Sequence, residues 1–273
     1  MRNRRISRRR FIEVAGTRVL ATALAVPIVY GAEPWDSIRS KTILKPEASK
    51  GGTYSGSNQT AKLMNPERSD SLGALDFVDD FDSFNTSRWE KGAHTLGRGS
   101  IDRNNVSIGA GKLVLKLPAK KYNGAEVASR GGYKYGNYSA MMVCPKAPGS
   151  VTAFFLYQET QGGNDEIDIE IYNDETRIVD FTVWARGRMT NSASQTLDFD
   201  PTEAFHDYRI SFHKRWVDFF VDGHFLQSWF SGLPVSSMKI VSNVWWPTWM
   251  SGPQPKTDSY ARIDRVQYSG TSI

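Results

Sequence analysis

Acidic and apolar residues alternate over positions 166–171, where Glu166, Asp168 and Glu170 are interleaved with three isoleucines. In an extended chain successive side chains point to opposite sides, so the three acidic residues share one face and the isoleucines share the other. An ordinary half-solvated strand is the simplest interpretation. However, acidic residues are depleted in strands, and like charges on one face repel each other. The pattern therefore favours a strand whose carboxylates carry out chemistry.

The rest of the chain offers short extended segments that can position this strand. Eight apolar segments have the length and composition of strands, and turn sequences such as Val221-Asp222-Gly223-His224 separate them. The predicted strands are 112–117, 138–143, 151–157, 177–184, 207–213, 216–221, 238–244 and 261–268. No segment has an apolar stripe of helical period and helix length. The pattern predicts an all-β sandwich of two packed antiparallel sheets, with an aromatic-rich concave face.

Length and composition are those of a globular chain. The 273 residues are 40% hydrophobic and 12% aromatic, which is enough for one or two domains with a large core. Residues 33–74 are rich in small and polar side chains, as in a linker or mobile lead-in. We expect the folded domain to occupy residues 75–273.

The first 32 residues have the features of an export signal. The sequence Ser7-Arg8-Arg9-Arg10-Phe11-Ile12 precedes an apolar run at 19–30 that is too short to span a bilayer. This resembles a twin-arginine signal, and a basic tail that contacts nucleic acid or anionic lipid is the alternative. Residues 1–32 hold seven arginines and one glutamate, a net charge of +6. The whole chain carries +5, so the remainder carries about −1. We expect a periplasmic or extracellular protein without a stable membrane anchor.

The charge of residues 33–273 and the cysteine count exclude some kinds of partner and site. A nearly neutral domain lacks the basic surface that nucleic-acid binding requires, and a neutral glycan matches it better. The single cysteine, Cys144, allows no internal disulfide and no cysteine metal site, and we expect it to be buried in a strand. A secreted chain without disulfides must rely on a large core, which about 200 residues can supply. We expect a monomer.

The acidic segment 165–170 resembles the catalytic signature of glycoside hydrolase family 16, in the regular-strand form of lichenase-type β-glucanases and xyloglucan transglycosylases. Further matching blocks follow the family's order over about residues 75–268, and they lie at 84–91, 102–106, 111–113, 135–138 and 216–223. The resemblance implies a β-jelly-roll sandwich of the concanavalin A-like type. It also implies retaining cleavage of a β-linked glucan, with no cofactor in catalysis.

By this resemblance Glu166 is the nucleophile, Asp168 the assisting carboxylate and Glu170 the general acid/base. A retaining mechanism needs two carboxyl groups ~5 to 5.5 Å apart, one to form the glycosyl-enzyme and one to protonate the departing oxygen. Cα atoms four residues apart on a strand are ~13 Å apart, so long glutamate side chains and strand curvature must close the gap. Like charges disfavour ionisation, and we expect Glu170 to be the glutamate that stays protonated near neutral pH.

The resemblance also implies a set of sugar-binding side chains. Glu126 corresponds to a family glutamate that hydrogen-bonds sugar hydroxyls, and the other positions are aromatic residues and one asparagine of the cleft. They are Phe155, Tyr157, Trp184, Asn243 and Trp245. Flat apolar rings pack against pyranose faces, while the hydroxyls at the ring edges need polar partners. Core packing is the alternative for the aromatic residues, since only one of Phe154 and Phe155 can face the cleft.

Three features depart from the family pattern. Asn164 stands where lichenases usually have a tryptophan, Thr182 replaces an asparagine, and the segment 92–100 is shorter than the matching glycan-contacting loop. We expect these departures to affect contacts with the substrate rather than the carboxylates, and so to change specificity more than catalysis. The shorter loop could bring His94 over the cleft as a further substrate contact.

A structural calcium site is the one metal site that the resemblance implies. In the family this site uses backbone carbonyls and one aspartate near the end of the chain. Asp264 matches that aspartate, and Gly111 and Asp80 lie near the carbonyl positions. Oxygen ligands suit calcium, and a plain surface-strand residue is the alternative for Asp264. The histidines have no ligand spacing for a transition metal.

Three functions stay open at this point. The leading one is an exported retaining endo-β-glucan hydrolase that acts on β-1,3-1,4-, β-1,3- or related glucans. A transglycosylase would use the same carboxylates and pass the glycosyl-enzyme to another sugar. A non-catalytic, lectin-like protein could share the sandwich, but it has no use for an acid and a nucleophile on one strand.

Overall fold

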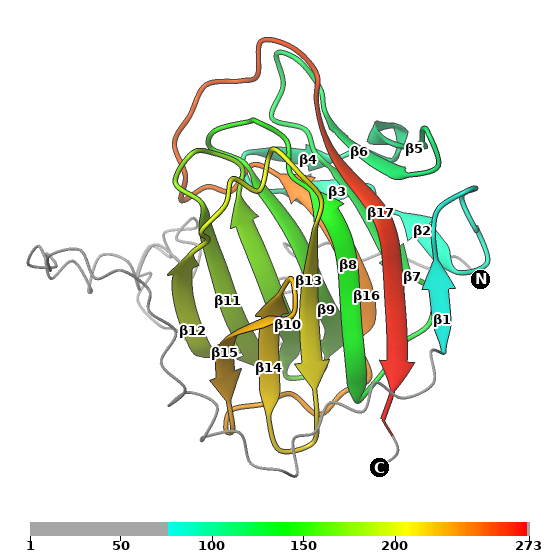
Figure 1. Cartoon of the computed structure of the whole chain (residues 1–273), viewed down its shortest axis with the longest axis vertical. Helices are drawn as coiled ribbons and strands as arrows, with labels where there is room; N and C mark the ends of the chain where they lie inside the picture. Colours follow the sequence, from blue (N-terminus) through cyan, green and yellow to red (C-terminus); the bar gives the residue numbers. More distant parts are fainter. Residues whose placement is uncertain (1–75, 272–273) are drawn as a thin grey trace, which may run out of the picture. The chain divides into compact units, whose positions relative to one another are not determined.

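The computed structural model describes residues 76–271, which form two packed antiparallel sheets (Figure 1). The export signal predicted at 1–32 and the lead-in predicted at 33–74 lie outside the described residues. Within 76–271 the single helical segment is the 3-10 turn η4 (Arg103–Asn105). This part of the chain contains no helix of the length and hydropathy needed to cross a membrane. The predicted all-β sandwich is confirmed.

The first sheet has eight strands, all paired antiparallel. Its order from one edge is β15 (His224–Trp229), β14 (Val217–Val221), β13 (His206–Phe212), β8 (Gly136–Val143), β17 (Ser259–Gly270), β6 (Leu113–Leu117) and β5 (Val106–Ile108), with β1 (Phe77–Asp79) paired to β17. The labels β13, β8 and β17 mark the sheet that faces the viewer in Figure 1.

The second sheet has seven antiparallel strands and carries the acidic segment in its interior. Its order is β12 (Arg188–Thr196), β11 (Ile178–Ala185), β10 (Gly163–Tyr172), β9 (Val151–Thr160), β16 (Lys239–Trp245), β7 (Ala125–Ser129) and β2 (Trp89–Lys91). A separate hairpin pairs β3 (His94–Leu96) with β4 (Gly99–Ile101). Strand β10 is held on both sides, by β9 and by β11, so its register is fixed along its length.

All eight predicted strands are present, and their ends lie within three residues of the prediction. The longer strands that sequence patterning missed are β7, β12 and β15. Strands β12 and β15 are sheet edges with mostly polar or half-buried residues, so neither needs the apolar run by which strands are recognised. Cys144 is buried as predicted, but it follows the last residue of β8, so its expected place within a strand was wrong by one residue.

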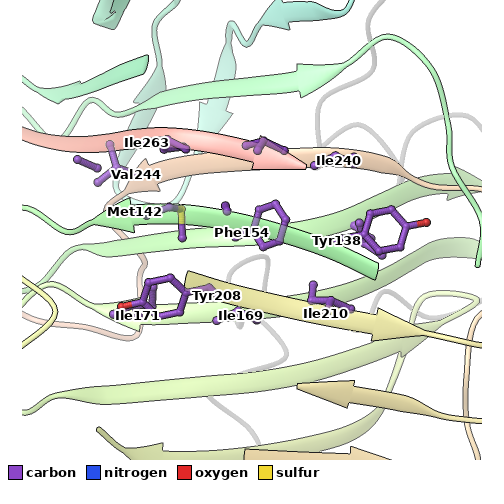
Figure 2. Packing of buried hydrophobic residues seen from close by; sticks show 14 of the residues in the cluster. Tyr138, Met142, Phe154, Ile169, Ile171, Tyr208, Ile210, Ile240, Val244 and Ile263 are labelled. Carbon is purple, nitrogen blue, oxygen red and sulfur yellow. The ribbon is translucent and has the colours of Figure 1, made fainter. Parts of the chain in front are cut away.

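The core lies between the two sheets (Figure 2). Ile169 and Ile171 point from β10 into this core, and Tyr208 and Ile210 point into it from β13 (Figure 2). Ile167, Ile169 and Ile171 all have 0% exposure. Full burial of an isoleucine side chain contributes about 1.5–3 kcal/mol, so this face of β10 is anchored strongly. A one-residue slip would exchange the isoleucines with the acidic residues, which makes the register of the carboxylates a consequence of the core.

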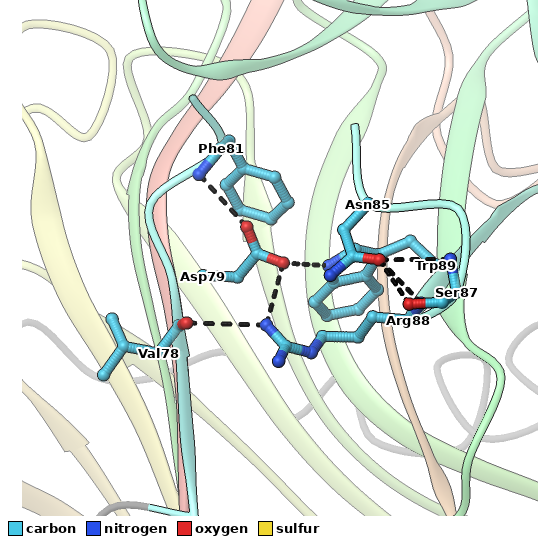
Figure 3. A network of polar contacts seen from close by, with 7 residues as sticks. All are labelled: Val78, Asp79, Phe81, Asn85, Ser87, Arg88 and Trp89. Atoms are coloured by element: carbon cyan, nitrogen blue, oxygen red, sulfur yellow. Dashed lines mark hydrogen bonds and ion pairs between the residues drawn. The ribbon is translucent and has the colours of Figure 1, made fainter. Parts of the chain in front are cut away.

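A buried aspartate ties the two sheets together at one edge (Figure 3). Asp79 ends β1 of the first sheet, and its Oδ2 accepts hydrogen bonds from Trp89 Nε1 of the second sheet at 2.8 Å and from Arg88 Nη1 at 3.0 Å. Its Oδ1 accepts the backbone N–H of Phe81 at 3.1 Å. The Arg88 guanidinium also lies 4.4 Å from the ring centroid of Phe77. This arrangement satisfies the indole N–H of a tryptophan that is only 1% exposed.

Candidate active site

The three predicted catalytic carboxylates lie on one face of β10, opposite the isoleucines. We call this side of the second sheet the carboxylate face. Glu166, Asp168 and Glu170 are 7%, 5% and 7% exposed, so the surrounding side chains cover most of their surface. Groups at such positions are rarely charged without a partner or a function. The alternation predicted from the sequence is therefore present, and the acidic face is far less open than that of an ordinary half-solvated strand.

Predicted aromatic residues flank the first two carboxylates on the neighbouring strands. Glu166 is paired with Tyr157 on β9 and with Trp184 on β11. Asp168 is paired with Phe155 on β9. Paired residues share a face of the sheet, so all three aromatic side chains lie on the carboxylate face. Phe155 is buried in a small cluster with Ala153 and Val241, apart from the main core, which holds Phe154. Phe155 is thus the member of the Phe154–Phe155 pair that lies on the carboxylate face.

Polar residues extend the carboxylate face beyond β9. Asn243 on β16 is paired with Ala153, the residue across from Glu170, and with Glu126 on β7. Asn243 Nδ2 donates a hydrogen bond to Glu126 Oε2 at 3.2 Å. His94 Nε2 lies 3.8 Å from Glu126 Oε1, which places this histidine beside a predicted sugar-binding residue. The structure therefore brings Asn243, Glu126 and His94 together on the side toward β2.

A pocket of about 510 Å³ lies on this part of the face. Phe155, Tyr157, Glu126 and His94 line it, together with residues that sequence reasoning missed. The missed residues include Glu90, Glu159 and Lys239. Lys239 Nζ donates to Glu90 Oε1 at 2.9 Å, and burial raises the pKa of the Glu159 carboxyl. Aromatic rings next to polar groups are a typical lining for a small-molecule or sugar site.

Trp245 has a different environment from the other predicted aromatic residues. It is buried in a second small cluster with Leu96, Ile101, Val151 and Tyr172, and its ring meets that of Trp249 edge-on with centroids 5.1 Å apart. Trp245 is paired with Val151, and Val151 with Tyr172, so its side chain also lies on the carboxylate face, apart from the main core. The 510 Å³ pocket lies beside β10, and the predicted catalytic and sugar-binding residues that do not line it are Trp184, Asn243, Trp245 and the three carboxylates.

Two departures from the family pattern bond directly to the carboxylates. Asn164 Nδ2 donates to Glu166 Oε2 at 2.5 Å, and Thr182 Oγ1 donates to Asp168 Oδ2 at 2.5 Å. The expectation that these positions affect the substrate rather than the carboxylates was therefore wrong. Asparagine and threonine are short side chains with donor groups, so at positions beside a carboxylate they bond to it.

No separate role was predicted from the sequence for two further aspartates near the site. Asp180 on β11 is paired with Glu170 and is buried on the carboxylate face. Asp165 is also buried, and its carboxylate accepts the backbone N–H groups of Arg186 at 2.9 Å and of Ser236 at 3.2 Å. Asp165 therefore holds two loops against the start of β10. Asp180 and Thr182 are two residues apart, so these two polar side chains share one face of their strand. That pattern was the signal that could have revealed Asp180.

Asp264, the one side chain predicted to bind calcium, is bonded to a lysine in the structure. Lys112, next to Gly111, donates a hydrogen bond from its ammonium group to Asp264 Oδ1. Asp264 lies at a bulge of β17, and Asp80 is exposed. A lysine ammonium on the aspartate competes directly with a dication for the same oxygen. Among residues 76–271 no group of three or more His, Cys, Asp or Glu side chains could hold a metal ion.

Comparison with known proteins places this site in a described family. A family model for glycosyl hydrolases family 16 matches residues 97–264. The β-glucanase of Bacillus subtilis is 30% identical over 208 residues, which cover 71% of this chain and 86% of that protein. The β-glucanase of Acetivibrio thermocellus is 30% identical over 209 residues, which cover 70% of this chain. The match spans 62% of the length of the Acetivibrio thermocellus protein.

A solved structure has a similar fold. It is a prokaryotic β-1,3-1,4-glucanase (lichenase) derived from a mouse hindgut metagenome, with a TM-score of 0.66 and 29% sequence identity. The superposition covers 71% of this chain and 99% of that chain. The residues matched by the family model, 97–264, include the strand that carries the three carboxylates.

Proposed function

Because the chain belongs to glycosyl hydrolase family 16, we propose that it is a retaining endo-β-glucan hydrolase. The observation that supports this most is the row of buried carboxylates on β10, flanked by aromatic rings on β9 and β11. A binding protein gains nothing from burying three acidic side chains side by side. The similar proteins are β-glucanases, and one similar structure is that of a β-1,3-1,4-glucanase. A mixed-linkage β-1,3-1,4-glucan is therefore the proposed first substrate.

In the first chemical step the Glu166 carboxylate attacks the anomeric carbon, and the bond from that carbon to the glycosidic oxygen breaks. Glu170 gives its proton to the departing oxygen, so the products are a glycosyl ester on Glu166 and a sugar with a free hydroxyl. Asp168 lies between the two glutamates on the same face and contributes negative charge near the developing oxocarbenium ion. Thr182 holds one oxygen of Asp168 in place.

In the second step a water molecule completes the reaction. Glu170, now ionised, accepts a proton from the water molecule while the oxygen of that water bonds to the anomeric carbon. The ester bond breaks, and its electron pair returns to the Glu166 carboxylate. Two displacements at one carbon restore the original β configuration. A sugar in place of this water would give the transglycosylase reaction with the same residues.

The polysaccharide would run across the second sheet, at right angles to β10. The 510 Å³ pocket on the β16, β7 and β2 side can receive sugar rings on Tyr157, with Glu126 and His94 at their edges. Trp184 on β11 offers a ring on the opposite side of the catalytic strand. A site with contacts on both sides of the scissile bond suits an enzyme that cleaves within a chain.

We also propose that the protein is exported. The support is the run of arginines and the apolar segment within residues 1–32, and a polymeric glucan is too large to enter a cell unaided. An epitope-tagged full chain expressed in a bacterium with a twin-arginine system should appear in the periplasm or medium. Its export should stop when Arg8 and Arg9 are both changed to lysine, and unchanged export of that variant would contradict the proposed route.

A panel of purified polysaccharides tests the activity. The full chain is incubated with mixed-linkage β-glucan, β-1,3-glucan and xyloglucan, and both new reducing ends and polymer size are measured. Hydrolysis gives reducing ends, transfer gives re-sized polymer without them, and a lectin gives retention without either. We expect reducing ends from the mixed-linkage glucan, and none from the Glu166→Gln variant with unchanged thermal unfolding. Wild-type activity in that variant would overturn the assignment of Glu166.

A further inference from the structure

We propose that Asn164 is a positioning residue that holds the Glu166 carboxylate in its reactive orientation. The inference rests on the proposed function, because it concerns the same nucleophile. Asn164 and Glu166 lie two residues apart on one face of β10, and Asn164 Nδ2 donates to Glu166 Oε2 at 2.5 Å. Asn164 is also a position at which this chain departs from the lichenase pattern, so the contact is a property of this sequence.

Contacts on both sides hold the backbone at Asn164, so the position of its Cβ atom is fixed. Asn164 is paired with Glu159 on β9, and its carbonyl accepts the N–H of Gly187 at 2.8 Å. The next residue, Asp165, is clamped on the other face by the backbone N–H of Arg186 at 2.9 Å. An asparagine side chain has only two rotatable bonds, so little freedom is left in the direction of its amide group.

The chemistry of the two groups sets the direction of the hydrogen bond. An ionised carboxylate can only accept, so the amide presents its nitrogen rather than its oxygen to Glu166. With the donor on Oε2, Oε1 is the oxygen that attacks the anomeric carbon. Holding a nucleophile in one orientation lowers the entropy that must be lost on the way to the transition state.

The same N–H acts again in the second step. When the ester bond to Glu166 breaks, an electron pair returns to the carboxylate, and a donor that is already aimed at it stabilises the developing charge. Asn164 neither gains nor loses a proton in either step. Its loss should therefore lower kcat in both halves of the reaction and leave KM close to the wild-type value, because the amide acts through Glu166.

Three variants of the full chain test this role on mixed-linkage β-glucan. Asn164→Ala removes the donor and should lower kcat by about 10- to 100-fold. Asn164→Asp is nearly isosteric, but its ionised form cannot donate and repels Glu166, so at neutral pH its kcat should be lower than that of Asn164→Ala. Asn191→Ala is the matched control, because Asn191 Nδ2 donates to Ser231 O at 3.0 Å and bonds to none of the three carboxylates. It should keep the wild-type kcat.

The pH dependence of Asn164→Asp separates positioning from a merely structural role. A protonated aspartic acid can donate again, so the ratio of the kcat of Asn164→Asp to that of the wild type should rise as the pH falls toward the ordinary carboxyl range of about 4. A ratio that is independent of pH, or a wild-type kcat for Asn164→Ala, overturns the role of Asn164. Thermal unfolding of each variant shows that it is folded at the assay temperature.

Different results would contradict the proposed function and the role of Asn164. If the wild type cleaves no β-glucan, or if Glu166→Gln cleaves at the wild-type rate, the proposed function fails and the role of Asn164 fails with it. If the wild type cleaves and Glu166→Gln does not, while Asn164→Ala retains full kcat, only the role of Asn164 is wrong.

Discussion

Asp180 on β11 lies directly opposite Glu170 on β10, and the Cβ atoms of such a pair are ~4.5–5.5 Å apart. Asp180 accepts hydrogen bonds from the Tyr172 hydroxyl at 3.0 Å and from Ser194 Oγ at 2.5 Å. It adds negative charge beside the proposed acid/base. Asp168 on the same strand adds more, while the neighbouring residue on β9 is the uncharged Ala153.

Removing this charge should change the pH dependence of the reaction. In Asp180→Asn the carboxylate opposite Glu170 is lost, so Glu170 gives up its proton more easily and the acid form disappears at lower pH. The alkaline limb of the kcat/KM profile on β-glucan should move down by about one pH unit. Ser194→Ala is the control, because it keeps the charge of Asp180 and removes one donor. An alkaline limb that stays in place in Asp180→Asn would show that this charge does not act on Glu170.

The Asp79 contacts at the sheet edge should carry a measurable share of the stability. In Asp79→Ala the buried indole N–H of Trp89 and the Arg88 guanidinium both lose their acceptor, at a cost of about 2–3 kcal/mol in the free energy of unfolding. For a domain of this size that lowers Tm by about 5–10 °C. Lys146→Ala is the control, since this side chain is 62% exposed and lies 3.8 Å from Asp200, and it should change Tm by less than about 2 °C. Equal Tm values for the two variants would contradict the account of this contact.

Cys144 should be unreactive in the folded protein. It is buried, and burial raises the pKa of its thiol to about 12, so almost no thiolate is present at neutral pH. Alkylation by iodoacetamide at pH 7.5, followed by mass spectrometry, should label the native chain negligibly and the urea-unfolded chain fully. Labelling of the native chain within minutes would show that the region after β8 opens readily.

Calcium should have little effect on stability. The Asp264 carboxylate is already bonded to the Lys112 ammonium, and a dication would have to displace it. Thermal unfolding after exhaustive treatment with a chelator, and again after addition of millimolar calcium, should give Tm values within about 2 °C of each other. A rise of more than about 5 °C with calcium would show that the ion displaces Lys112, and it would restore the family's calcium site for this chain.

The elements that sequence patterning identified are those with strong apolar constraints. The isoleucines of β10 had to face the core, and this alone placed Glu166, Asp168 and Glu170 together. The eight predicted strands are likewise rich in buried apolar residues. Strands β12 and β15 were missed because they are edge strands, in which water can replace half of the backbone partners and no apolar run is needed.

The contacts made by the carboxylates could not be predicted from one sequence. They depend on which residues of β11 lie opposite β10, and that register is set by the whole sheet. Asp180 and Thr182 therefore became visible only through their pairing with Glu170 and Asp168. Asn164 was recognised as unusual, but its amide was expected to affect the sugar. Its bond to Glu166 depends on a side-chain direction that strand alternation alone does not specify.

The most direct test of the central claim is chemical rescue of the two glutamates with azide. Glu166→Ala has lost the nucleophile, so azide can attack an activated β-glucosyl fluoride from the opposite face and give an α-glycosyl azide. Glu170→Ala keeps the nucleophile, so azide replaces water in the second step, releases the ester on an activated aryl β-glycoside and gives a β-glycosyl azide. We predict these two products, in that assignment, by nuclear magnetic resonance of the anomeric protons. The opposite assignment, or the same anomer from both variants, would contradict the roles given to Glu166 and Glu170.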